Sequence, residues 1–270
     1  MNEIKQFEIR NILLFLLMNF AWTWLFWLPS VLSPTGNSDP FFFILFIIGG
    51  YGPFVGAFSL TYINEKKEGV KALWKRFWNI KIKMKWLLIT ILLIPALYVF
   101  SSLVVILIQE TPPILTWISQ PWVIINYLLT AFFVGGFSEE FGWRGYALDR
   151  FQVKVGGLIS SIIIGIIWGL WHLPVWFIAG DPHGARGIPD FFLFLSETAF
   201  LSILYTWLYN NTNRSIFIAV IFHTIFNFMS FSIILSDIGD IIYLIFFYIT
   251  VIIVVLFFRE KKLLKLSNIN

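Results

Sequence analysis

The 270-residue sequence contains no cysteine and little charge. Without cysteine the chain has no disulfides, no thiolate metal ligands and no cysteine nucleophile. Charged residues make up 13% of the chain, whereas about 25% is typical of soluble domains. Hydrophobic residues reach 59% and aromatic residues 20%. This composition excludes an ordinary soluble domain and indicates an integral membrane protein.

Long apolar runs, bounded by charged residues or by Pro and Gly clusters, fill most of the sequence. A bilayer core about 30 Å thick requires roughly 20 apolar residues per helical crossing, and a helix satisfies its own backbone polar groups in lipid. We therefore predict an all-α, polytopic bundle of eight transmembrane helices around a membrane-embedded polar cavity, forming one domain over residues 1–270. The runs lie at about 9–32, 41–64, 85–108, 121–148, 157–179, 190–209, 215–236 and 239–258.

The basic residues are distributed unequally between the loops. An eight-helix threading places all 19 Lys and Arg residues except Arg186 on the face that carries both termini. Because cytoplasmic loops are enriched in Lys and Arg, we predict a multi-pass protein of the cell membrane with both termini in the cytoplasm. The first run is long and lacks a small-residue cleavage site, so it is predicted to be a retained helix.

Residues 65–85 interleave Lys and Arg with Leu, Trp, Phe and Ile. This pattern predicts an amphipathic segment at the cytoplasmic membrane interface. The net charge of +4 arises largely from such segments next to apolar runs. Membrane lipids are therefore the expected partner of the basic residues, and no nucleic acid is expected.

Two adjacent carboxylates lie within the fourth run, where an ionisable residue indicates function by default. Adjacent helix positions point about 100° apart, so Glu139 and Glu140 face different surroundings. Glu140 and Arg144 are spaced i,i+4, which predicts a supporting ion pair. Glu139 has no cation at helical spacing and is predicted to be the carboxylate available for proton transfer.

Three further polar residues fall within later apolar runs. His172 lies near Pro174, which perturbs its helix, and His223 and Asn227 are spaced i,i+4 and so project from one helix face. At about 1.5 Å per residue, Glu139, His172 and His223 lie roughly 16, 24 and 13 Å from their cytoplasmic helix ends. All three depths fall within the hydrocarbon region, with His172 the deepest.

Other candidate residues are given structural interpretations. Glu197 in the sixth run either faces the cavity or lies in an outer vestibule, and His183 falls in the outer loop; both are interpreted as structural. Ser138 lacks the context of a serine nucleophile, because two carboxylates follow it directly.

The order of three motifs gives a family resemblance. EEFGWRG, then GLWHLP, then HTIFN make the chain resemble the CAAX prenyl protease and bacteriocin-processing family, also called the Abi or CPBP family, over residues 120–230. The second motif of that family usually has phenylalanine four residues before the histidine, and this chain has Trp168 there. An aromatic ring is retained at this position.

The resemblance implies an intramembrane endopeptidase acting on a peptide or lipidated protein. By this resemblance, Glu139 and His172 of this chain would activate a water, and His223 and Asn227 would hold the oxyanion. Two alternatives stay open. The first is a zinc peptidase with Glu139, His172 and His223 as ligands. No cofactor is favoured, because the HExxH motif of zinc peptidases is absent and Asn227 is better suited to donate from its amide than to bind a metal. The second is a non-catalytic binding, immunity or scaffold protein that uses the same cavity.

Overall fold

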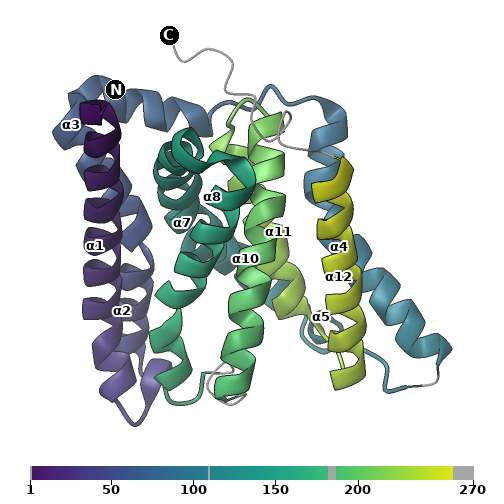
Figure 1. The fold of residues 1–270 in the computed structure, drawn as a ribbon. Helices are drawn as coiled ribbons and strands as arrows, with labels where there is room; N and C mark the ends of the chain where they lie inside the picture. Colours follow the sequence, from purple (N-terminus) through teal and green to yellow (C-terminus); the bar gives the residue numbers. More distant parts are fainter. Residues whose placement is uncertain (1, 109, 182–186, 258–270) are drawn as a thin grey trace.

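The computed structural model describes residues 2–108, 110–181 and 187–257, and this part of the chain is almost entirely helical (Figure 1). The predicted all-α class is therefore confirmed. One short antiparallel bridge pairs β1 (Ile114–Leu115) with β2 (Ile233–Ile234). The α-helices are α1 (Asn2–Leu32), α2 (Pro40–Gly50), α3 (Gly52–Phe77), α4 (Met84–Leu107), α5 (Thr116–Ser119), α6 (Val123–Thr130), α7 (Phe137–Gly142), α8 (Asp149–Trp171), α10 (Ile188–Asn211), α11 (Ile216–Ser232) and α12 (Asp237–Phe257). Short 3-10 turns form η1 (Gly36–Ser38) and η4 (Leu173–Phe177), and π-helical turns form η2 (Ala131–Gly136) and η3 (Trp143–Leu148).

Helix length and composition identify fewer candidate membrane spans than the eight predicted crossings. In the described chain, five helices are long and apolar enough to cross a membrane, or six if α2 and α3, bent by 41°, form one broken span. One of the five spans 55 residues, Val123–Phe177, and a straight helix of that length would measure about 80 Å. Gly156, at φ 77° and ψ 172°, breaks this segment where α8 turns back. The protein is a multi-pass membrane protein, but the count of eight crossings is not confirmed.

Helices α8 and α10 pack very closely because glycine lies at their contact. A Cβ atom added to Gly165 would lie 2.5 Å from the Cα of Ala199, and one added to Gly169 would lie 2.6 Å from the Oγ1 of Thr198. Small residues allow the backbones of membrane helices to approach in this way. The contact fixes the rotation of α8, and with it the direction of Trp168.

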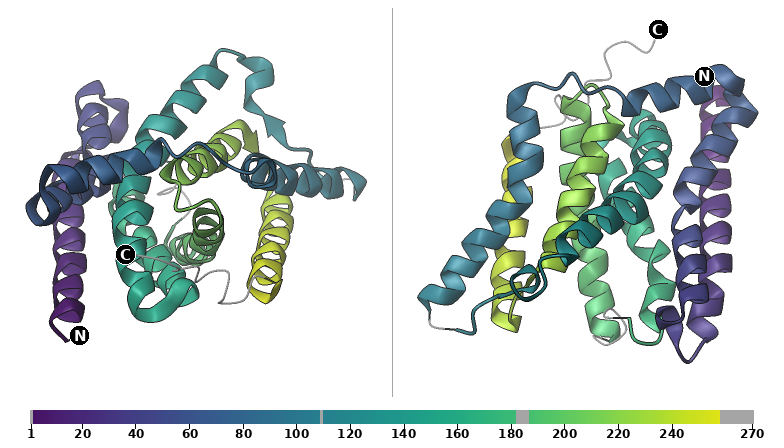
Figure 2. Two further views of the ribbon diagram at one scale, coloured as in Figure 1. Left: turned by 90° about the horizontal axis from the view of Figure 1, so that it is seen from above. Right: turned by 180° about the vertical axis from the view of Figure 1, so that it is seen from behind.

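The second half of α3 crosses one end of the bundle, the end at which α1 begins (Figures 1 and 2). A break at Lys66, with φ 59°, redirects the helix there. Beyond the break, Leu73 and Phe77 are buried while Lys71 and Lys75 are exposed. The predicted interfacial segment 65–85 is thus amphipathic and helical as far as Phe77; its contact with lipid stays a prediction, as do the positions of the termini relative to the cytoplasm.

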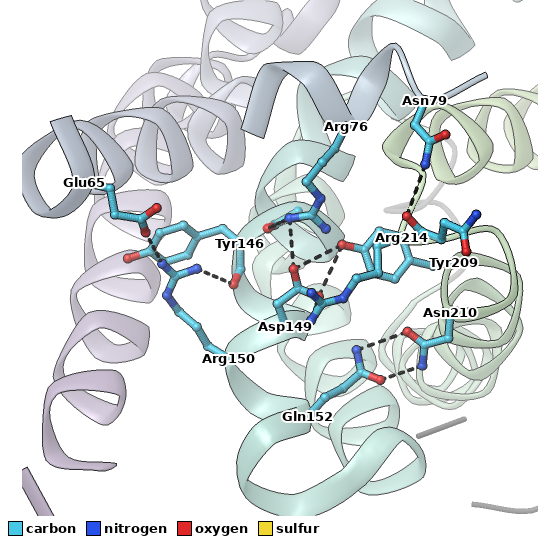
Figure 3. Close-up of polar contacts among 12 residues, drawn as sticks. Glu65, Arg76, Asn79, Tyr146, Asp149, Arg150, Gln152, Tyr209, Asn210 and Arg214 are labelled. Carbon is cyan, nitrogen blue, oxygen red and sulfur yellow. Dashed lines mark hydrogen bonds and ion pairs between the residues drawn. The ribbon is translucent and has the colours of Figure 1, made fainter. Parts of the chain in front are cut away.

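A polar network ties this end of the bundle together (Figure 3). Its centre is Asp149, the first residue of α8, which accepts from Arg76 of α3 at 2.9 Å and from Arg214 at 3.2 Å. Arg76 also donates to the backbone oxygen of Gly145 at 2.9 Å, on the turn that follows the two glutamates. The network therefore anchors the glutamate-bearing segment to α3. Its other members are Glu65 with Arg150, Tyr209 with Asp149, Gln152 with Asn210, and Asn79 with the backbone of Asn213.

Candidate active site

The two glutamates lie on α7, a short helix between two π-helical turns. Wider π turns inside a helix are frequent at functional sites because they redirect side chains. Glu139 is 4% exposed and Glu140 is fully buried. Arg144, also fully buried, donates from Nη1 to the Oε1 of Glu140 at 3.1 Å, so the predicted ion pair is present.

Glu140 has a second partner, which the helical spacing did not indicate. The Nδ1 of His223 lies 2.7 Å from the same Oε1 atom of Glu140. His223 comes from α11 and is 2% exposed. Arg144 completes the cluster: its guanidinium lies 3.8 Å from the ring centroid of Tyr205 and donates to Ser202 of α10 at 3.4 Å. Glu140 therefore contacts both Arg144, four residues along its own segment, and His223, 83 residues away.

Glu139 points to a different neighbour, as the 100° offset predicts. Its Oε2 atom accepts a hydrogen bond of 2.6 Å from the indole Nε1 of Trp168 on α8. His223, Glu140 and Arg144 are near enough to act on Glu139 electrostatically. Among the described residues no hydrogen bond is made to Oε1, so one carboxylate oxygen is held and the other has no protein donor.

His172 ends α8 and lies one turn beyond Trp168. Its Nδ1 lies 2.9 Å from the backbone oxygen of Trp168. Because a carbonyl oxygen only accepts, Nδ1 carries a proton, and a neutral ring would then have Nε2 as its acceptor nitrogen. Trp168 lies one turn before His172 on α8 and is the residue of that helix that reaches Glu139. His172 was predicted to lie deeper than Glu139, and Trp168 links the two.

His223 and Asn227 project from the same face of α11, as predicted, and both lie against the backbone of η2. A Cβ atom added to Gly135 would lie 2.5 Å from the Nδ2 of Asn227 and 3.2 Å from the Nε2 of His223. A glycine is therefore required there for close approach. Both the amide group of Asn227 and the second imidazole nitrogen of His223 therefore lie next to Gly135, which is four residues before Glu139.

The alternative ligand set Glu139, His172 and His223 does not form a ready metal site. Among the residues that the structure describes, no group of three His, Asp or Glu side chains is arranged to hold an ion. His172 presents Nδ1 to the backbone oxygen of Trp168, and His223 presents Nδ1 to the carboxylate of Glu140. A metal would require these side chains to converge from three helices.

Two other candidates have contacts of their own. Glu197 of α10 lies close enough to Tyr243 of α12 to act on it electrostatically. Ser138 donates to the backbone oxygens of Val134 and Gly135, which is a structural role. His183 lies outside the described residues. The sequence predicted only an aromatic ring at Trp168, and its hydrogen bond to Glu139 was not predicted; its position one turn before His172 was the available signal.

Comparison with known proteins covers the segment that carries these residues. Residues 120–229 match the model of the type II CAAX prenyl endopeptidase Rce1-like family. CAAX prenyl protease 2 of Methanococcus maripaludis is 28% identical over 226 residues, which cover 79% of this chain and 82% of the relative. The chain is thus similar to CAAX prenyl endopeptidases over this segment, and the similarity supports a membrane-embedded protease. Glu139, His172, His223 and Asn227 all lie within the matched residues.

Two other proteins that are similar to this chain have a different name. Lysostaphin resistance protein A of Staphylococcus haemolyticus is 31% identical over 125 residues, covering 46% of this chain and 31% of the relative. The protein of the same name from Staphylococcus aureus strain Newman is 26% identical over 205 residues, covering 73% of this chain and 45% of the relative. The matches therefore span less than half the length of these two relatives.

Proposed function

We propose that the protein hydrolyses a peptide bond of a membrane-associated substrate, with Glu139 as the general base. The observation that carries this proposal is the different environment of the two glutamates. Glu140 is neutralised by Arg144 and bound to His223, whereas Glu139 receives one indole donor at Oε2. A buried carboxylate without a cationic partner is suited to take and return a proton.

The reaction would proceed in two steps. Glu139 removes a proton from water while the water oxygen attacks the scissile carbonyl carbon, and the negative charge moves to the carbonyl oxygen. The C–N bond then breaks, and Glu139 returns the proton to the leaving amine. The acceptor nitrogen Nε2 of His172 would orient the water, because its Nδ1 is engaged with a backbone carbonyl.

The oxyanion would be held by the Nδ2 group of Asn227 and the Nε2 of His223. Both atoms lie at Gly135 and so can serve one oxygen atom. Nδ1 of His223 faces the carboxylate of Glu140, and in the doubly protonated ring Nε2 would be a second donor. Each such donor is typically worth about 10²–10³ in kcat.

The substrate proposed is the lipidated C-terminal segment of a protein. CAAX prenyl protease 2 of M. maripaludis carries that specificity in its name, and it covers most of this chain. A prenyl group partitions into the hydrocarbon region and would bring the adjacent peptide to a site buried among transmembrane helices. No metal is assigned to the mechanism, since Glu139 supplies the base and the α11 donors supply the charge stabilisation.

The test uses purified protein in detergent or proteoliposomes with a prenylated C-terminal peptide and the same peptide without the prenyl group. Cleavage is followed by mass spectrometry. We expect the wild type to cleave the prenylated peptide and Glu139→Gln to be inactive. Glu197→Gln is the matched control, because it removes the same charge from a residue of α10 that lies close to Tyr243 of α12.

A chelator arm distinguishes the zinc alternative. We expect activity to survive chelation; loss that zinc restores would replace the glutamate mechanism with the metal one. Activity in Glu139→Gln equal to that of Glu197→Gln would refute the role of Glu139. A wild type that cleaves neither peptide, in a preparation shown to be folded, would refute the proposed substrate class.

A further inference from the structure

Trp168 makes the shortest hydrogen bond that reaches either glutamate. Its Nε1 donates to the Oε2 of Glu139 at 2.6 Å, and the two residues are 3% and 4% exposed. A bond from a neutral donor to a charged acceptor in a buried site is among the stronger hydrogen bonds in proteins. It is also the one hydrogen bond that the described residues make to the Glu139 carboxylate.

The indole ring is itself fixed on several sides. Edge contacts join it to His172 at 5.7 Å, His223 at 5.5 Å and Tyr205 at 6.0 Å between ring centroids. The guanidinium of Arg144 lies 5.3 Å from its centroid. Trp168 thus contacts both site histidines and the ion pair, and its side chain has little freedom to move independently of them.

We propose that Trp168 is a positioning residue that acts through Glu139. Its N–H holds Oε2, which leaves Oε1 as the oxygen directed to the substrate water. This inference rests on the proposed function, because it assigns a role within the same reaction. It also gives a meaning to Trp168 standing where the family pattern usually has phenylalanine. A phenyl ring at position 168 would keep the packing but would supply no hydrogen-bond donor.

The predicted consequence is a loss of turnover with little loss of binding. Without its donor the Glu139 carboxylate is free to rotate, so fewer enzyme molecules hold the base in line with the water. Hydrogen bonds to charged groups at this level correspond to about a ten- to hundredfold change in kcat. The substrate makes no proposed contact with Trp168, so KM should remain within about twofold.

The experiment compares Trp168→Phe with Trp143→Phe in the purified, reconstituted protein. Trp143 is a suitable control because it is fully buried in η3, directly after α7, and its Nε1 has no hydrogen-bond partner among the described residues. Both substitutions remove the same atoms from a buried site. We expect kcat to fall about ten- to hundredfold in Trp168→Phe only.

A second variant separates the hydrogen bond from the shape of the ring. Protein carrying 3-benzothienylalanine at position 168 keeps the fused ring and replaces the N–H by sulfur. It should show the same loss of kcat as Trp168→Phe, even if the smaller phenyl ring impairs folding.

The outcomes distinguish this inference from the proposed function. Equal kcat values in the benzothienylalanine protein and the wild type would overturn the role of Trp168, provided that Glu139→Gln is inactive. An active Glu139→Gln would instead refute the proposed base, and the role of Trp168 with it.

Discussion

The substitution Gly135→Ala tests the proposed oxyanion site without altering any residue that would act in the reaction. The added methyl group would lie 2.5 Å from the Nδ2 of Asn227 and 3.2 Å from the Nε2 of His223. An ordinary carbon–nitrogen contact needs about 3.5 Å, so the amide must move by about 1 Å. Both crowded atoms end flexible side chains, and alanine favours helix over glycine by about 1 kcal/mol, so the fold should tolerate the change.

The expected effect on catalysis is large. A displacement of about 1 Å at a reacting group costs on the order of 10²-fold, similar to the loss of one oxyanion donor. We therefore expect kcat for the prenylated peptide to fall about 10²-fold, with a melting temperature close to that of the wild type.

The neighbouring glycine provides the matched control. A Cβ atom added to Gly136 would lie 2.6 Å from the backbone oxygen of Val220, a rigid atom of α11. Gly136→Ala should therefore lower the melting temperature by forcing η2 away from α11. Unchanged kcat in a well-folded Gly135→Ala protein would refute the assignment of the oxyanion to Asn227 and His223.

Three other predictions follow from individual contacts. Asn227→Ala should reduce kcat about 10²–10³-fold at an unchanged melting temperature. A lower melting temperature that accompanies the loss of kcat would indicate a packing role instead. Glu140→Gln leaves Arg144 buried without its counter-charge, so unfolding should become easier by about 3–5 kcal/mol, measured by thermal or denaturant unfolding in detergent. Asp149→Asn removes the charged partner of Arg76 and should therefore loosen α3 from the bundle. The expected result is faster hydrogen exchange in the second half of α3. Unchanged exchange would show that the network of Figure 3 does not anchor α3.

Local patterns in the sequence were enough to predict several features that depend on one helix. Apolar runs of membrane-spanning length specify helices, because lipid offers the backbone no other hydrogen-bond partners. The spacing of Glu140 and Arg144 gave their ion pair, and the spacing of His223 and Asn227 gave their common face. The order of the three motifs predicted the similarity to CAAX prenyl proteases that the comparisons found.

Only the tertiary structure decided which helix faces meet. The bond between Glu140 and His223 spans 83 residues, and that between Trp168 and Glu139 spans 29. Both bonds depend on how α7, α8 and α11 are oriented relative to one another, which the periodicity of each separate run does not encode. The bend between α2 and α3 was not predicted for a similar reason, because it lies inside one apolar run, 41–64, that composition alone does not divide.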